Sequence, residues 1–241
     1  MDRLHLSQHI SQQFNTELAA LTRQVLAMGG LVEAQLATAL EALAERDASR
    51  SADVIAREDA VNAAELEIDA RCTQILARRQ PAASDLRLVL AVVRMVANLE
   101  RIGDEAERIA KLAEKLGGVE LAESYGLKLA QMGALVRDQL RGTLDTFARM
   151  DETRALERLR RDREVDVLYK ELTAMLVGLM QRESDRVPAA LDLLWCARSL
   201  ERIGDRCKNI CEQVIYLVRG KDVRHTGLAR SAAPLPDMGQ A

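Results

Sequence analysis

The sequence contains an internal duplication, and this feature constrains the fold more than any other. Residues 28–47 (MGGLVEAQLATALEALAERD) align with residues 132–151 (MGALVRDQLRGTLDTFARMD) and are identical at 9 of 20 positions, where about one identity is expected by chance. The hexapeptide LERIGD occurs at 99–104 and recurs unchanged at 200–205. Each half of the chain is therefore predicted to fold into the same kind of unit.

The composition indicates that the repeated unit is helical. Trp, Tyr and Phe together account for only 6 of the 241 residues and Pro for 4, whereas Ala, Leu, Glu and Arg dominate. These residues form helices readily and strands poorly, which excludes an all-β fold. Glycine, proline and aspartate mark the joints between helices. Six long helices are predicted, at 10–46, 50–79, 82–116, 121–149, 153–183 and 188–219.

The predicted architecture is all-α, with two tandem, duplicated three-helix bundles. Short joints favour antiparallel packing of consecutive helices, and two units of about 110 residues fit the usual size of small domains. The expected boundaries are 1–118 for the N-terminal bundle and 119–220 for the C-terminal bundle. Helical periodicity ends after Gly220, so residues 221–241 are predicted to form a flexible tail.

Charge and cysteine usage exclude several classes of function. The net charge is −3 with both signs interspersed, so neither nucleic acid nor an anionic membrane is an expected partner. No window of 18 residues is wholly apolar and no hydrophobic leader opens the sequence, so a soluble, intracellular chain is expected. The four cysteines lack C-x-x-C spacing and are predicted to be reduced core residues.

A repeated pair of acidic residues is the strongest chemical signal. Glu100 and Asp104 are four residues apart and project from one side of a helix, as do Glu201 and Asp205 in the second half. A like-charge pair at this spacing costs a few tenths of a kcal/mol in an isolated helix. Because the costly pair occurs twice in the same context, we expect something to offset the repulsion.

The preceding helix of each half carries a related pair. Asp162 and Asp166 repeat the acidic spacing in the second half, and Glu58 with Asn62 is the weaker counterpart in the first. Two further acidic residues continue that stripe: Glu65 and Asp69. On the last predicted helix the carboxylates lie opposite the apolar face, so neighbouring helices are expected to bring acidic edges together across a surface groove.

Such a groove has the chemistry of a cation site. Carboxylates without imidazole or thiolate suit hard ions, namely Mg²⁺, Mn²⁺, Ca²⁺ or ferric iron, rather than Zn²⁺ or copper. A ferritin-like di-iron centre needs Glu-x-x-His motifs, whereas the three histidines, His5, His9 and His225, lie outside the acidic helices. That type of centre is therefore excluded.

A simpler interpretation treats the acidic residues as a solvated face with ordinary helical ion pairs, such as Asp104 with Arg108. Repetition in both halves weighs against it. So does the glycine inside each hexapeptide, Gly103 and Gly204, because glycine costs about 1 kcal/mol within a helix. These glycines predict a close approach between helices.

Several longer motifs give the chain a resemblance to a known family. They are HISQQFNTEL at 9–18, the MGG helix starting at 28, RRQPAASDLRLV at 78–89, LERIGD at 99–104, and CARSLERIGDRCKNICE followed by RGKDVRH within 196–225. Together they resemble the PhoU family, regulators associated with the high-affinity phosphate transporter of bacteria. The resemblance spans nearly the whole chain. It implies two three-helix bundles, a homodimer, and multinuclear metal sites built from paired E(D)xxxD motifs.

The resemblance also implies which residues bind metal. Glu100 with Asp104, Asp162 with Asp166, and Glu201 with Asp205 match the family motif. Glu58 matches its first position, but Asn62 places an amide where the motif has a carboxylate. Tighter metal binding is therefore expected in the second half. The implied ions are divalent or ferric, with Mg²⁺, Mn²⁺ or iron favoured.

The implied function is that of a cytoplasmic adaptor without enzymatic activity. It would couple the ATPase subunit of a phosphate ABC transporter to a phosphate-sensing histidine kinase, and so keep the phosphate-starvation (Pho) regulon off. Its association with the inner membrane would be indirect, through these partners. Two alternatives stay open: a metal-dependent enzyme acting on a phosphate compound at the acidic groove, and a purely structural helical module. Neither a nucleotide-binding loop nor a Ser-His-Asp arrangement supports an enzyme.

Overall fold

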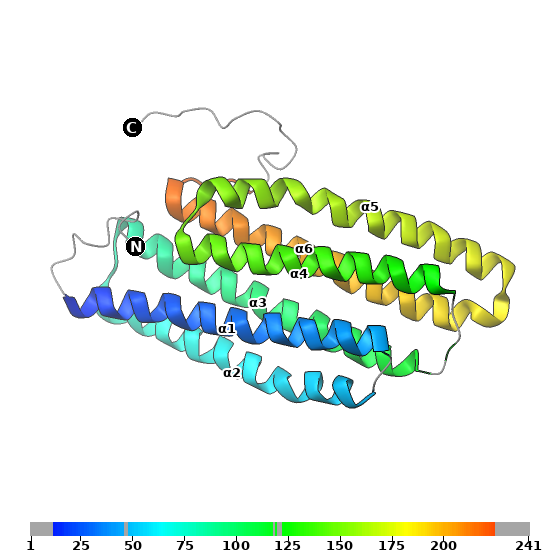
Figure 1. Ribbon diagram of the computed structural model, residues 1–241. Coiled ribbons are helices and arrows are strands. Elements are labelled where there is room, and N and C mark those ends of the chain that lie inside the picture. The colour runs from blue at the N-terminus through cyan, green and yellow to red at the C-terminus, as the bar shows by residue number, and fades with distance from the viewer. Residues whose placement is uncertain (1–11, 46–47, 118, 120–121, 225–241) are drawn as a thin grey trace.

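The computed structural model describes the chain except for residues 1–11, 46–47, 118, 120–121 and 225–241 and the side chains of Ala48 and Asp162. Six long helices make up nearly all of it (Figure 1). They are α1 (Gln12–Glu45), α2 (Ala48–Arg79), α3 (Ala83–Lys115), α4 (Glu123–Arg149), α5 (Glu152–Arg182) and α6 (Val187–Arg219), with a short 3₁₀ helix, η3 (Ser184–Arg186), before α6. The six predicted helices are confirmed, each end within two residues. Most of the predicted tail lies outside the described residues.

The ends of the later helices show why they begin and end where they do. The side chain of Asp151 accepts a hydrogen bond of 3.1 Å from the backbone N–H of Arg154 at the start of α5, as expected of an N-cap. Pro188 lies in the first turn of α6, where a missing N–H costs nothing. Gly220 ends α6 with φ of +72°, a left-handed conformation that glycine adopts without strain.

The two halves of the chain pack against each other through α3 and α6 (Figure 1). These helices run antiparallel, because Arg94 donates to Gln213 at 3.4 Å near one end while Arg202 donates to Glu105 at 2.9 Å towards the other. Ser199 adds a hydrogen bond of 2.7 Å to the second oxygen of Glu105. Buried apolar residues of all six helices form one continuous core, so the halves are joined by both apolar and polar contacts.

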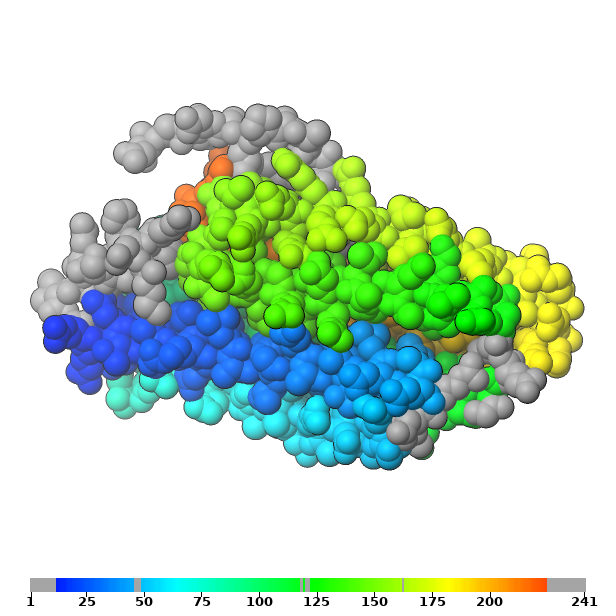
Figure 2. All heavy atoms as spheres, viewed as in Figure 1, coloured from blue at the N-terminus to red at the C-terminus, as the bar shows by residue number. Residues whose placement is uncertain are grey.

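Helices α1 and α4 meet on one face of the molecule, where they lie side by side (Figure 2). A Cβ built on Gly29 of α1 would lie 2.5 Å from Leu144 Cδ2 of α4, and one built on Gly133 of α4 would lie 2.6 Å from Leu40 Cδ2 of α1. Gly133 and Leu144 follow Gly29 and Leu40 by the same 104 residues. The duplicated helices therefore interlock by the same contact made twice, in opposite directions.

Among the described helices, α1 alone is long and apolar enough to cross a membrane by length and composition. Its position in the bundle accounts for that composition. Leu18, Leu21, Val25, Val32 and Leu36 are all essentially inaccessible to solvent, and α1 packs against α2, α3 and α4. An amphipathic helix with neighbours on three sides needs this much apolar surface for the core alone.

Candidate functional site

The structure brings the predicted acidic residues of the first half together between α2 and α3. Glu58 is buried, Glu100 and Asn62 are half-buried, and Asp104 is exposed. Glu58 and Glu65 of α2 both interact electrostatically with Asp104 of α3. Acidic residues of the two helices therefore lie close enough to repel one another, and their role in binding metal stays a prediction. The burial of Glu58, only 8% exposed, was not expected of a surface groove.

Glu58 is buried because α1 supplies a polar partner for it. The amide Nε2 of Gln35, itself fully buried, donates a hydrogen bond of 2.6 Å to Glu58 Oε2. Across from this pair is Gly103 of α3, whose missing side chain leaves the space: a Cβ there would lie 3.1 Å from Gln35 Oε1 and 3.3 Å from Glu58 Oε2. The predicted close approach at this glycine is confirmed. Gly204 of the second hexapeptide is buried as well.

Burial and mutual repulsion disfavour the charged forms of this cluster. Burial raises the pKa of Glu58, with Asp104 adding to the effect and the Gln35 hydrogen bond opposing it. Burial also raises the pKa of Glu100, again reinforced by Asp104. Asp104 is exposed but partly desolvated, and this partial desolvation, followed by repulsion from Glu107 and Glu105, raises its pKa as well. The pKa of Glu65 is raised by burial and by its neighbours Asp69 and Asp104. An added cation nearby would relieve this repulsion.

The second half arranges its acidic residues differently. Glu201 accepts a hydrogen bond of 2.7 Å from Arg198 on the same helix, and its side chain is 14% exposed. Asp205 is exposed and Asp166 is half-buried. The side chain of Asp162 lies outside the described part of the structure. The second half therefore supplies its own cation to one of its predicted metal ligands.

The residues of the first half fit a hard cation by their chemistry. Two buried oxygens, Glu58 Oε1 and Gln35 Oε1, lack a hydrogen-bond partner, as does Asp69 Oδ1. Buried polar atoms are normally satisfied, and carboxylate and amide oxygens are the ligands of Mg²⁺, Mn²⁺ and Ca²⁺. Within the residues that the structure describes, no three His, Cys, Asp or Glu side chains are grouped closely enough to hold a metal. A cation there would thus draw on few side chains and several waters.

The cysteines occupy the core, as predicted. All four are buried: Cys72, Cys196, Cys207 and Cys211. Burial raises the pKa of the Cys72 and Cys196 thiols to about 12 and that of Cys211 to about 11. Because the thiolate is the reactive form, these residues are inert at neutral pH. Besides packing in the core, Cys211 Sγ lies 3.4 Å from Thr143 Oγ1, within hydrogen-bond distance.

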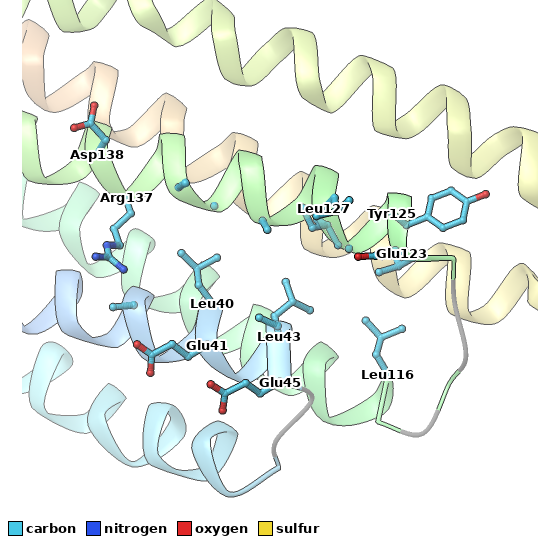
Figure 3. A pocket seen from close by; sticks show the side chains of 18 of the residues that line it. Leu40, Glu41, Leu43, Glu45, Leu116, Glu123, Tyr125, Leu127, Arg137 and Asp138 are labelled. Carbon is cyan, nitrogen blue, oxygen red and sulfur yellow. The ribbon is translucent and has the colours of Figure 1, made fainter.

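A second feature was not predicted. A groove of about 830 Å³ lies between the C-terminal half of α1 and the N-terminal half of α4 (Figure 3). Leu40 and Leu43 of α1 lie on one side of it, and Arg137 lies towards one end. None of the predicted site residues lines it. The small residues spaced along α4, Gly126, Ala130 and Ala134, are the sequence signal that could have indicated it, since small side chains leave room beside a helix.

Comparison with known proteins agrees with this architecture. A family model described as PhoU domain matches twice, at residues 25–113 and 129–214. The chain belongs to the PhoU family. Each half thus carries one PhoU match, which agrees with the duplication seen in the sequence.

PhoU relatives and solved PhoU structures are similar over most of their length. A phosphate-specific transport system accessory protein PhoU from Serratia marcescens is 45% identical over 228 residues, 94% of this chain and 93% of the relative. A PhoU homolog from Pseudomonas aeruginosa is 45% identical over 93% of each chain. The crystal structure of PhoU from Pseudomonas aeruginosa superposes with a TM-score of 0.83 at 42% identity, covering 86% of this chain and all of that one. PhoU from Streptococcus pneumoniae gives 0.81 at 33% identity, covering 87% and 99%.

Proposed function

We propose that this chain is a regulatory adaptor of phosphate homeostasis. It would restrain phosphate uptake and the Pho regulon by linking the ATPase subunit of a phosphate ABC transporter to a phosphate-sensing histidine kinase. The observation that carries this proposal is similarity over more than nine tenths of the chain to proteins named as accessory proteins of the phosphate-specific transport system. The adaptor acts in the cytoplasm and reaches the inner membrane only through its partners.

The fold suits such a role without requiring a reaction. Six long helices around one core present extended faces that carry both signs of charge. An adaptor changes the activity of a partner by binding one of the partner's states better than another, for which a binding surface is sufficient. Because binding alone is enough for this role, we propose that the chain is not an enzyme. We also propose that it works as a homodimer. Light scattering of the purified chain tests the second statement, with a mass of twice the chain expected.

The acidic residues are proposed to bind Mg²⁺, Mn²⁺ or iron. In the first half the residues are Glu58, Asn62, Glu100 and Asp104; in the second half they are Asp162, Asp166, Glu201 and Asp205. A bound cation would supply positive charge that neutralises the neighbouring carboxylates. The raised pKa values of Glu58, Glu100 and Asp104 support this for the first half, because carboxylates that repel one another gain most from a cation between them.

The adaptor is tested by deleting its gene in the source organism and measuring alkaline phosphatase activity in phosphate-replete cells. High activity that falls when the gene is restored is the expected result. Low activity in both strains would contradict the adaptor and favour a metal-dependent enzyme acting on a phosphate compound. That alternative is tested directly by adding Mn²⁺ and measuring phosphate release with the purified protein.

A further inference from the structure

Gln35 is an unusual residue for the centre of α1. It is 0% exposed, and its neighbours along the buried side of the helix, Val32, Leu36 and Ala39, are all apolar. A buried amide costs free energy unless its hydrogen bonds are made. The other buried polar residue of α1 for which a bond is seen, Thr22, bonds back to Leu18 O of its own helix at 3.1 Å. Gln35 instead reaches across to another helix.

The amide of Gln35 points into the acidic cluster. Its Nε2 lies 2.6 Å from Glu58 Oε2 and 3.4 Å from the carbonyl oxygen of Val54. The bond fixes Oε2 of Glu58 and leaves Oε1 of Glu58 without a hydrogen-bond partner. Oε1 of Gln35 also lacks a partner. Two residues that are both more than nine-tenths buried therefore each keep one unpartnered acceptor, and one of them, Glu58, interacts electrostatically with Glu100 and Asp104.

The duplication provides an independent observation. Gln139 of α4 follows Gln35 by 104 residues and is also buried, at 5% exposure. The duplicated segments differ at 11 of 20 positions, yet both keep a buried glutamine at this register. The same spacing relates Glu58 to Asp162. Each half thus carries a glutamine on its first helix at the position that, in the first half, reaches the first acidic residue of the second helix.

We propose that Gln35 is a positioning residue of the first acidic cluster, and that Gln139 is its counterpart in the second half. Gln35 holds one oxygen of Glu58 so that the other oxygen is presented to a hard cation. Gly103 keeps open the space that the pair occupies. This inference rests on the metal binding proposed above, and its test separates the two.

The test uses the full-length chain with Gln35→Met, which keeps a similar volume and removes the donor. Carboxylates of the metal-free protein are labelled with a carbodiimide and an amine and located by mass spectrometry. Mn²⁺ affinity is measured by calorimetry in a background with Glu201→Ala and Asp205→Ala, so that only the first cluster is read. Gln139→Met is the matched control, because it changes the corresponding residue in the other half.

Labelling of Glu58 is expected to rise severalfold in Gln35→Met and to stay unchanged in Gln139→Met. Mn²⁺ affinity of the first cluster should fall by about 10- to 100-fold, the usual effect of removing a residue that orients a metal ligand. Gly103→Ala provides a second variant that reaches the same pair from α3, and it should act in the same direction. If Gln35→Met does not fold, the same two measurements are made on Gly103→Ala instead.

Unchanged labelling of Glu58 would overturn the positioning role. Increased labelling with unchanged Mn²⁺ affinity would show that Gln35 shields Glu58 without affecting the cation, which also overturns the positioning role. A parent protein that binds no Mn²⁺ would contradict the proposed metal binding, and the inference would fail with it. The labelling result would still show separately whether Gln35 holds Glu58.

Discussion

The two copies of LERIGD have the same sequence but lie in different electrostatic surroundings. Three residues before the glutamate of the hexapeptide, the first half has Ala97 and the second half has Arg198. After the hexapeptide, the first half has Glu105, and the second has Arg206 at the same register. Glu107 is likewise matched by Lys208. The duplication has therefore kept the hexapeptide unchanged and altered the charges at these flanking positions.

This difference determines how each motif compensates its negative charge. In the first half, burial and neighbouring acids raise the pKa of Glu100, with Arg101 opposing. In the second half, Glu201 forms an ion pair with Arg198 at 2.7 Å. One repeat presents repulsion that an added cation would relieve, and the other relieves it with a side chain. Identical motifs can thus differ in what they bind.

The largest expected effect concerns cation binding by the separate halves. Glu100→Ala with Asp104→Ala should weaken Mn²⁺ binding by the first half by about 100-fold or more, because two carboxylates are lost. Glu201→Ala with Asp205→Ala should do the same for the second half. Calorimetric titration of both variants gives the affinity of each remaining half.

The same titration ranks the halves. Considered by itself, the neutral amide of Asn62 in the first half favours tighter binding in the second half, where Asp166 supplies a carboxylate. The ion pair of Arg198 with Glu201 opposes that ranking, because the metal must displace it. We expect the variant that keeps the first half to bind more tightly. Equal affinities, or tighter binding by the other variant, would show that the ion pair of Arg198 with Glu201 does not outweigh the amide of Asn62.

The next effect compares the two interlocked glycines. Gly29→Ala should lower stability by about 1–2 kcal/mol, because the new Cβ overlaps the buried Leu144 and helix propensity returns only part of the loss. Gly133→Ala should be nearly neutral, since Leu40 is half-buried and can turn into the neighbouring groove. Thermal unfolding measures both. A larger loss in Gly133→Ala would contradict the proposed difference in rigidity.

A smaller effect concerns pH. A carboxyl whose pKa is raised on folding binds more protons in the folded state, so it lowers stability as pH rises above its ordinary value of 4.5. Glu58→Gln removes this penalty and keeps an acceptor for Gln35. The metal-free variant should gain on the order of 1 kcal/mol at pH 7, about 2–4 °C in Tm, and little at pH 4. Asp162→Asn is the matched change in the second half, because Asp162 follows Glu58 by 104 residues. A gain for Glu58→Gln that is the same at both pH values would exclude the desolvated carboxylate as its cause.

The smallest effect tests the comparison by exchanging residues between the repeats. Ala97→Arg should pair with Glu100 and weaken Mn²⁺ binding by the first half about threefold, and Arg198→Ala should strengthen binding by the second half by a similar factor. These values follow from the modest free energy of a partly exposed ion pair. Lys at position 97 serves as a control for charge without the guanidinium. Changes of the same sign in both variants would disprove the compensation.

The sequence predicts the helices well because their determinants are local. Apolar periodicity, Gly220 and Pro188 act within a turn or two of the residues they affect. The four-residue spacing of the acidic residues on α2 and α3 is also enough to predict that each pair lies on one side of its helix. The burial of Glu58 could not be predicted, because it depends on Gln35, which is 23 residues away and on another helix. The groove beside α4 escaped prediction for the same reason, since its walls come mainly from α1 and α4, with Leu116 and Leu193 contributed by other parts of the chain.

The reciprocal contacts of Gly29 with Leu144 and Gly133 with Leu40 suggest how such a chain originated. A chain of one repeat would carry both the leucine and the glycine on a single helix, so two copies could associate through the same pair of contacts. Once two copies of the repeat are joined in one gene, they no longer have to have identical sequences. Each copy is then free to acquire its own charges while the shared seam preserves the fold. One ancestral surface thereby becomes two surfaces that selection can adjust separately.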